Sequence, residues 1–426
     1  MGNLDLDKIQ GNIVPGFNKD HQAFVFVRFQ SAEQGRNWLG EMQADLASAN
    51  QVQRFRQTFN ELRQRAPHGQ DAPDGGALQH ISATWVNLAL AHAGIRLMAG
   101  AAAQSGLPNT FRFNRVPGVA SAAQPEVHAL LIVGADRCQD LEDELAHQRQ
   151  RLAATGTTEV QTFRGDALPG AQRGHEHFGF KDGISQPRIA GYDWGCGADV
   201  APGEFVLGYP DQTGASSGSG LPAWTQNGSF VAFLQLQQHV ATFWTAMQQH
   251  AQQLGVQAKD LASCVVGRTE DGAMRSTPPA RLSHIGRAYS RWLGPNEALR
   301  HRIIRRGLPY GPAWTPGEAD GEVDRGLLFV SYQADLERQF EHVWTQWLGD
   351  RNFPLPGAGT DALTGQKAPL QPGVAQTPWT AASTRPTAVT RANQMGGYAS
   401  LSLPSFVTPG YGGYFFAPAI GTTFTS

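Results

Sequence analysis

Runs rich in β-branched and aromatic residues alternate along the chain with amphipathic stretches. The run QAFVFVRF, residues 22–29, precedes SAEQGRNWLGEM, and the same succession recurs at three further places. Aromatic and β-branched enrichment predicts strands, and apolar positions three or four residues apart predict helices. We therefore expect strand–helix pairs at residues 22–42, 126–153, 228–251 and 325–348.

Two of the expected helices carry an apolar stripe that should face a core. The stripe residues are Val240, Phe243, Trp244 and Met247 in one helix and Leu336, Phe340, Val343, Trp344 and Trp347 in the other. Tryptophans at such positions are more often core residues than functional ones. We therefore interpret Trp344 and Trp347 as core.

The four pairs divide the chain into two similar halves. Two pairs precede residue 190, two follow residue 225, and residues 190–227 between them are rich in Gly, Pro and Ser. This arrangement indicates a duplicated α+β module, each copy a sheet with helices on one face. The expected domains are residues 1–189 and 228–426, joined by that bridge. A second loop-rich region, residues 351–397, is too long for an idle connection and should be ordered by packing or by a ligand.

Composition narrows the class of protein. The 426 residues carry a formal net charge of -2 with a pI near 6.7, so no basic field for nucleic acid is expected. The three cysteines, Cys138, Cys196 and Cys264, form no C-x-x-C pair, which fits a reducing compartment. No apolar run has membrane-spanning length and no secretory leader is evident, so the expectation is a soluble cytoplasmic protein without membrane contact.

Several familiar strings lack the context that their chemistry needs. The stretch 214–218 matches G-x-S-x-G, but no strand precedes it and Pro222 stands where a helix should begin, so we interpret it as a linker. His175 and His177 could suggest a metal pair, but zinc normally takes three or four ligands. We interpret both as ordinary surface residues. No P-loop string and no G-x-G-x-x-G after a strand occurs, which leaves nucleotide binding unsupported.

The segment HFGFKDGISQPRI, residues 177–189, admits two interpretations of Asp182. Asp-Gly is a common turn dipeptide, so Asp182 could simply mark a corner. Against this, apolar side chains flank it, small residues allow a ligand to approach the backbone, and the segment lies between the two halves, where ligand sites tend to form. The second interpretation is a carboxylate held in a dry pocket for proton transfer.

Two further segments hold candidate residues. His284 lies in SHIGRAYSRW after a proline-rich stretch, and Arg305 and Arg306 lie in HRIIRRGLPYGP. A lone histidine is usually structural, and a pair of arginines is usually solvated. Neither segment identifies a site alone.

Taken together, these segments resemble the dye-decolourising peroxidase family of haem enzymes. GFKDG, residues 179–183, is similar to the family's G-x-x-D-G signature, and RIIRRGLPYGP to its distal arginine segment. QGNIVPGFNKD, WVNLALAHAGIRLM, GSFVAFLQLQQHV, GAGTDALTGQ and FVTPGYGGYFFAP resemble other family segments in the same order. The resemblance implies an α+β fold of two ferredoxin-like modules, with antiparallel sheets, helices on the outer faces and a haem pocket mainly in the C-terminal half.

The resemblance also assigns roles by position. His284 matches the proximal haem ligand, and Asp182 matches the distal acid–base carboxylate. Arg305 matches the distal arginine, with Arg306 as the alternative if the register differs by one. Asp361 occupies a loop position from which an aspartate can hydrogen-bond the proximal histidine.

Further expected haem contacts are Phe180, Gly183 and Ile184, which flank the distal carboxylate. The chain also departs from the family pattern. Gly286 replaces an arginine that commonly reaches a haem propionate, and Arg287 is the expected substitute. Tyr289 and Ser290 replace an Asn-Pro pair.

A second departure concerns the edge of the haem. Thr269 stands where the family often has tryptophan, so the haem edge should be more open. For substrates oxidised at the surface through aromatic radicals, the candidates are Trp194, Tyr411 and Tyr414.

The implied activity is that of a haem b peroxidase with one haem per chain. It would reduce hydrogen peroxide through a high-valent ferryl intermediate and oxidise small phenolic or aromatic donors, including dyes. Two alternatives stay open: a haem-binding protein with little turnover, and an α+β interaction protein without haem.

Overall fold

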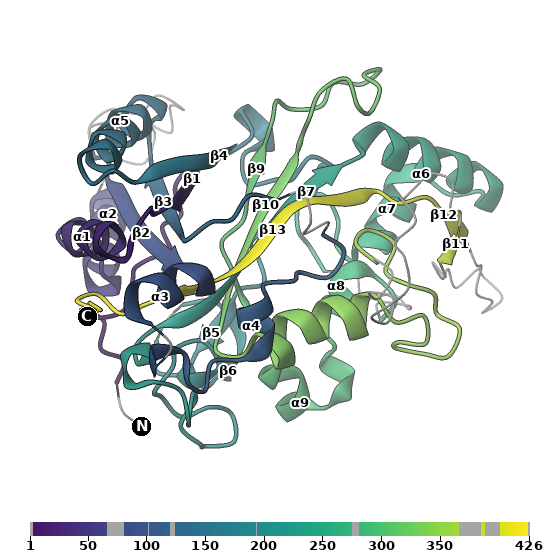
Figure 1. Ribbon diagram of the computed structural model, residues 1–426. Coiled ribbons are helices and arrows are strands. Elements are labelled where there is room, and N and C mark those ends of the chain that lie inside the picture. The colour runs from purple at the N-terminus through teal and green to yellow at the C-terminus, as the bar shows by residue number, and fades with distance from the viewer. Residues whose placement is uncertain are drawn as a thin grey trace.

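The computed structural model describes residues 3–65, 81–100, 102–119, 124–192, 194–274, 281–365, 385–387 and 401–424. Within these residues a nine-stranded antiparallel sheet runs through the molecule (Figure 1). Its strands are β1 (His21–Arg28), β2 (Thr84–Leu90), β3 (Ala129–Ala135), β4 (Thr158–Asp166), β7 (Ser229–Gln238), β8 (Ile304–Arg305), β9 (Leu308–Tyr310), β10 (Gly326–Gln333) and β13 (Val407–Ala417). The order is β4-β1-β3-β2-β13-β7-β10-β8, and β9 also pairs with β10.

The two halves of this sheet repeat one arrangement. Numbered within each half, the orders β4-β1-β3-β2 and β13-β7-β10-β8 are both 4-1-3-2. Helices connect the first strand to the second and the third to the fourth, which is the β-α-β-β-α-β ferredoxin-like unit. The expected pair of ferredoxin-like modules is therefore confirmed. Strand β13, yellow in Figure 1, joins them because it pairs with β7 and, at Phe416 opposite Leu90, with β2.

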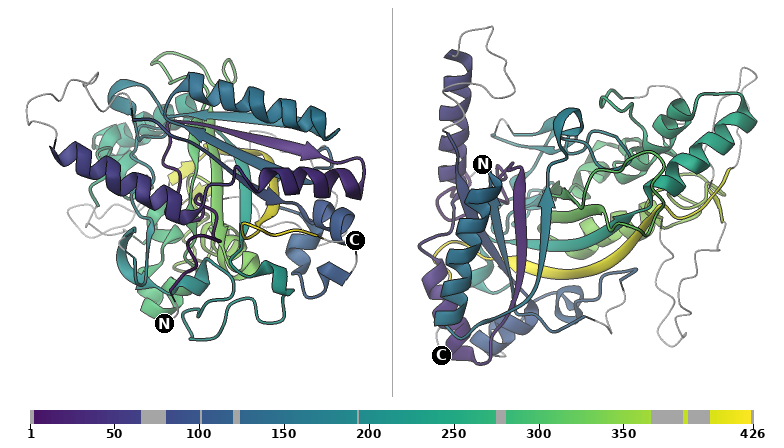
Figure 2. Two further views of the ribbon diagram at one scale, coloured as in Figure 1. Left: turned by 90° about the vertical axis from the view of Figure 1, so that its left-hand side faces the viewer. Right: turned by 90° about the horizontal axis from the view of Figure 1, so that it is seen from above.

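Helices occur where the hydrophobic pattern predicts them, and all four strand–helix pairs are present. The helices are α1 (Ala32–Met42), α2 (Ala49–Arg65), α3 (His92–Ala99), α4 (Asn109–Phe113), α5 (Cys138–Ala154), α6 (Val240–Leu254), α7 (Ala258–Val266), α8 (His284–Ala288), α9 (Pro295–Arg300) and a π-helix (Leu336–Leu348). All five stripe residues of the π-helix are buried, whereas Trp244 in α6 is partly exposed. Figure 2 shows α1, α2 and α5 together on the outer side of the first module's strands.

Aromatic side chains from both modules meet on the inner side of the sheet. The ring of Phe26 on β1 lies 5.0 Å from that of Phe233 on β7 and 4.9 Å from that of Tyr411 on β13. Phe163 on β4 lies 5.7 Å from the same Phe26 ring. Edge-to-face contacts of this kind add to the stabilisation from burial. The modules therefore share one core and hold each other in a fixed orientation.

The loop regions behave as the composition suggests where they are described. In the bridge, β6 (Cys196–Val200) pairs with β5 (Pro187–Ile189), the strand just before the bridge. Residues 214–218 lie in turns and not between a strand and a helix, and the side chain of Asp211 accepts backbone hydrogen bonds there. The nucleophile-elbow geometry is thus not formed.

The second loop-rich region is ordered in part. Residues 351–365 pack against α8, as expected for a loop held by packing, whereas 366–384 and 388–397 lie outside the described residues. The short strands β11 (Arg385–Thr387) and β12 (Leu401–Leu403) pair with each other.

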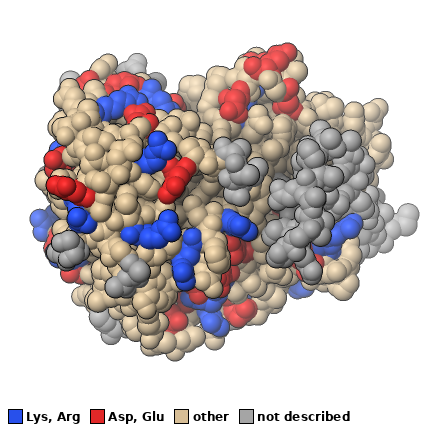
Figure 3. All heavy atoms as spheres, in the orientation of Figure 1, with Lys and Arg blue, Asp and Glu red and all other residues tan. Residues whose placement is uncertain are grey.

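The surface shows no strong single-sign field on the face that Figure 3 presents. Basic and acidic side chains are intermixed there, in keeping with the near-neutral net charge. In the described part of the chain, no helix combines the length and the apolar character needed to cross a membrane.

Candidate active site

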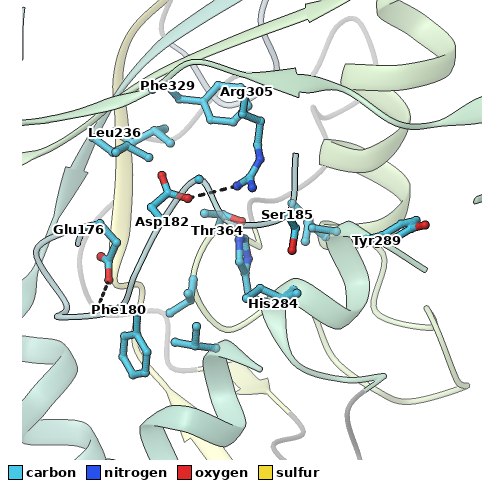
Figure 4. Close-up of a pocket in the computed structure, with 18 of the residues that line it drawn as sticks. Glu176, Phe180, Asp182, Ser185, Leu236, His284, Tyr289, Arg305, Phe329 and Thr364 are labelled. Carbon is cyan, nitrogen blue, oxygen red and sulfur yellow. Dashed lines mark hydrogen bonds and ion pairs between the residues drawn. The ribbon is translucent and has the colours of Figure 1, made fainter. Parts of the chain in front are cut away.

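A large cavity lies between the Asp182 segment of the first module and the helices and strands of the second. Its volume is about 1520 Å³, including the space open to solvent at its mouth. Most of its wall is apolar, for example Phe180, Leu236, Val266, Phe329, Phe340 and Val343. Figure 4 shows its polar residues: Asp182 and Arg305 on one side, with the imidazole of His284 pointing toward them from the other.

His284 is the first residue of α8, and Ser283 caps that helix through a 3.1 Å bond from the Gly286 N–H. Its Nδ1 lies 3.0 Å from Oδ2 of Asp361. Burial by itself lowers the pKa of the imidazole, but the Asp361 carboxylate outweighs burial and raises it above the ordinary value. No described residue hydrogen-bonds Nε2, so this nitrogen is left to face the cavity. The contact expected of Asp361 is therefore present.

The carboxylate of Asp361 is itself fixed by its own loop. Oδ2 accepts hydrogen bonds from the backbone N–H of Leu363 at 3.1 Å and of Thr364 at 2.8 Å, and from the Thr364 hydroxyl at 3.1 Å. Burial raises the pKa of this carboxyl, but His284 and these donors together hold it below the ordinary value. Asp361 is thus an ionised group that orients the imidazole.

Asp182 and Arg305 face each other across the other side of the cavity. Nη1 of Arg305 lies 3.3 Å from Oδ1 of Asp182, and each side chain is about one-third exposed. The side chain of Gln186 fastens the two segments together, because it accepts from the Arg305 N–H at 3.0 Å and donates to its carbonyl at 2.9 Å. Gly183 has φ +75, which favours glycine, and it lines the cavity beside the carboxylate. Asp182 and Arg305 therefore face the cavity side by side.

Glu176 shapes the Asp182 loop and was not singled out from the sequence. Its carboxylate accepts from the backbone N–H groups of Phe178 and Phe180, both at 2.9 Å, and from the side chain of Gln238 at 2.5 Å. Burial raises the pKa of Glu176 to about 7 against the effect of these donors. The sequence signal for this residue is an acidic side chain directly before the apolar Phe178–Phe180 stretch.

His177 and Arg306 both form hydrogen bonds with backbone carbonyls outside the Asp182 segment. His177 is buried, its Nε2 bonds to the Tyr310 carbonyl at 2.8 Å, and burial lowers its pKa to about 4, so the surface interpretation was wrong for it. Arg306 is partly buried against the N-terminal segment and donates to carbonyls at 2.9–3.0 Å. Arg305, and not Arg306, therefore faces Asp182.

Phe180 and Ile184 line the cavity as expected, but Arg287 does not. The Arg287 guanidinium is fully buried and turns toward backbone carbonyls of the 350–359 loop, with a 2.9 Å bond to Gly359 O. It is already occupied in holding that loop, so the expectation that it replaces the arginine missing at Gly286 was wrong.

The three aromatic residues expected to take part in oxidation at the surface differ in how far they are buried. Tyr414 is fully buried and its hydroxyl donates to Glu341 at 2.8 Å, and Tyr411 is only 9% exposed, so neither is a surface site. Trp194 is partly exposed and stacks on Tyr192 at 4.6 Å. Trp344 is a core residue, as expected, and also lines the cavity.

The fold and this cavity define a class: two fused ferredoxin-like modules around a site with an imidazole–carboxylate pair facing a carboxylate–guanidinium pair. Comparison with known proteins gives the family. The Dyp-type peroxidase C-terminal domain matches residues 210–355, and the DyP dimeric alpha+beta barrel domain matches residues 8–106.

Individual relatives agree with these matches. Dye-decolorizing peroxidase msp1 of Mycetinis scorodonius is 28% identical over 85% of this chain and 77% of its own length. Dye-decolorizing peroxidase AauDyP1 of Auricularia auricula-judae is 28% identical over 98% and 86%. A solved ancestral D-type dye decolorizing peroxidase has 27% identity and a TM-score of 0.80, covering 99% of this chain and 98% of its own. The chain belongs to the DyP-type peroxidase family and is a peroxidase.

DyP-type peroxidases are haem enzymes, and the residues of this cavity fit haem. The apolar walls suit a flat macrocycle, and an imidazole with Nδ1 tied to a carboxylate presents Nε2 as an iron ligand. Within the described residues no group of three or more His, Cys, Asp and Glu side chains could hold a bare metal ion. Of the two histidines that line the cavity, His301 has both ring nitrogens hydrogen-bonded, whereas Nε2 of His284 has no described partner.

We expect Arg287→Met to destabilise the protein by several kcal/mol. Four carbonyl contacts lose their donor, and each buried acceptor left unpaired costs roughly 1–3 kcal/mol. Urea unfolding followed by tryptophan fluorescence measures the effect. Arg188→Met is the control, because that guanidinium is exposed and should contribute within about 0.5 kcal/mol. Equal, small losses in both variants would contradict the structural role of Arg287.

We expect Asp361→Asn to lower peroxidase turnover by about 10–100-fold, the usual effect of removing a partner that orients a metal ligand. The matched control is Thr364→Val, which removes one donor to the carboxylate but keeps its charge. The turnover of Thr364→Val should fall by no more than about fivefold, the equivalent of one hydrogen bond. Steady-state oxidation of a dye with peroxide measures both, and equal losses would show that the charge of Asp361 is unimportant.

Proposed function

We propose that this protein is a haem b peroxidase, with one haem per chain, that reduces hydrogen peroxide and oxidises phenols and aromatic dyes. The observation that carries the proposal is a single cavity that places His284 opposite the Asp182–Arg305 pair. The relatives' printed names, dye-decolorizing peroxidases, support aromatic dyes as electron donors.

His284 would supply the axial ligand through Nε2. The Asp361 carboxylate accepts the Nδ1 proton, fixes the ring tautomer and makes Nε2 more electron-rich. Bound haem supplies the redox chemistry, delivering two electrons to peroxide and taking them back singly from organic donors. The role of the protein is then to position protons and charge on the opposite side.

Asp182 would move the proton that peroxide cleavage requires. Its carboxylate can take the proton from the inner peroxide oxygen as a base and return it to the outer oxygen as an acid, so that water leaves. Arg305, 3.3 Å from the carboxylate, would stabilise the negative charge that develops on the outer oxygen. Gln186 keeps the two groups in register during both transfers.

The ligand assignment predicts a spectral result. Protein reconstituted with haem should show the absorption spectrum of histidine-ligated haem and should oxidise a dye when peroxide is added. His284→Ala should lose that spectrum, whereas the exposed control His147→Ala should keep it.

Other outcomes would favour the alternatives. An unchanged spectrum in His284→Ala would refute the ligand assignment. A haem spectrum in the wild type without turnover would favour a haem-handling protein, and failure to take up haem would favour an interaction protein.

The acid–base assignment predicts both a rate and a pH profile. Asp182→Asn should lower turnover by about 10²–10⁴-fold, the usual contribution of a positioned acid–base group. In the wild type, turnover should persist at pH 4–5, because carboxylates ordinarily titrate near pH 4 and imidazoles near 6.5. Asp199→Asn, an exposed carboxylate outside the cavity, is the control. A wild-type profile that collapses below about pH 6 would contradict Asp182 as the acid–base group.

A further inference from the structure

Two buried arginines line the cavity without an acidic partner. Arg268 is 7% exposed and Arg302 is 9% exposed. Both donate to the same residue: Nη2 of Arg268 reaches the Ser185 hydroxyl at 2.6 Å, and Nη2 of Arg302 reaches the Ser185 carbonyl at 2.7 Å. Nη1 of Arg268 also donates to the Gly272 carbonyl at 2.6 Å, so its partners in the protein are all neutral. These contacts aim both guanidinium groups at one edge of the cavity, three residues beyond Asp182.

The charge at this edge is not balanced by the protein. Among the described residues, neither Arg268 nor Arg302 forms an ion pair with Asp or Glu. The adjoining residues 275–280, which are not described, contain no Asp or Glu in their sequence. Among the described residues, the neighbouring carboxylates already have other partners: Asp182 is paired with Arg305, and Glu270 with Lys259.

Further positive charge crowds the same edge. Arg291 and Arg302 both lie over the ring of Tyr289, at 4.8 and 3.9 Å from its centroid. Burial, together with repulsion from Arg305 and Arg291, lowers the pKa of Arg302 to about 10, and similar effects lower that of Arg268. A buried charge without a counter-charge is costly. A bound anion at this edge would therefore be stabilised by both guanidinium groups.

The chemistry of the anion follows from the shape of the cavity. One edge is cationic and the rest of the wall is largely apolar, which is complementary to a flat apolar ring that carries acidic groups along one side. Haem has that form, with two propionate carboxylates on one edge. Guanidinium groups bind carboxylates strongly because they can donate two parallel hydrogen bonds.

We propose that Arg268 and Arg302 bind the haem propionates in this protein. The inference rests on the proposed haem function and extends it to residues outside the expected set. Gly286 has no side chain to reach a propionate, and Arg287 is turned into the 350–359 loop. The anchoring charge therefore comes from the turn after α7 and from the residues just before β8.

The test compares iron protoporphyrin IX with its dimethyl ester, in which both carboxylates are capped. Dissociation constants come from Soret titration, and dissociation rates from haem transfer to apomyoglobin. The wild type should prefer the free acid by about 30-fold or more, the factor expected when a buried charge pair is broken. In Arg268→Gln/Arg302→Gln the free acid should lose that factor, while the ester changes little.

Two control variants sharpen this result. Arg188→Gln changes an exposed arginine outside the cavity and should keep the wild-type preference. Arg287→Met should also keep it, even with lower stability, because that guanidinium does not face the cavity. The wild-type comparison needs no variant, so it remains valid if the double variant fails to fold. The single variant Arg268→Gln gives a second measurement of the preference for the free acid.

The outcomes separate the two proposals. If the wild type binds acid and ester equally while showing a histidine-ligated spectrum, the propionate assignment is overturned and the haem function stands. A preference that survives in the double variant also overturns it. If neither porphyrin binds, both proposals fail.

Discussion

The hydrogen bond from His284 to the buried carboxylate of Asp361 is the interaction on which the cavity depends. A buried carboxylate needs hydrogen-bond donors, and here the imidazole and the following backbone N–H groups supply them to Oδ2 of Asp361. The same bonds fix the loop that carries Asp361 and the face of α8 that carries His284. Arg287 completes this unit by binding the loop carbonyls, so one buried anion and one buried cation shape a segment that has no regular structure.

Hydrogen bonds from polar side chains also hold the loops on the opposite side of the cavity. Glu176 ties together the loop that leads to Asp182, and Gln186 ties Asp182's segment to β8, so that Arg305 meets the carboxylate. Glu176 and Gln186 thus have protein partners, whereas Nε2 of His284 has no described hydrogen-bond partner, and Arg268 and Arg302 have no described acidic partner. Polar groups that a protein leaves without partners are where a ligand is bound.

The fusion of two modules explains where this site lies. Each module repeats the strand order 4-1-3-2, and β13 pairs with both, which sets the modules in one sheet with one aromatic core. The cavity is lined mainly by the second module, but Asp182 comes from the end of the first. The junction between the modules therefore sets the position of Asp182 relative to Arg305.

The sequence by itself determined the two-module α+β organisation, the strand–helix pairs and, through its resemblance to a family, His284, Asp182 and Arg305. Those features are local, because hydrophobic periodicity and short motifs depend only on residues close together in the sequence. Only the tertiary structure decided that Arg287 turns away, that His177, Tyr411 and Tyr414 are buried, and that Glu176, Arg268 and Arg302 belong to the cavity. The direction of a long side chain and the burial of a charge depend on partners far apart in the chain, such as Ser185 for both arginines. No local pattern specifies such a meeting, which exists only once the chain has folded.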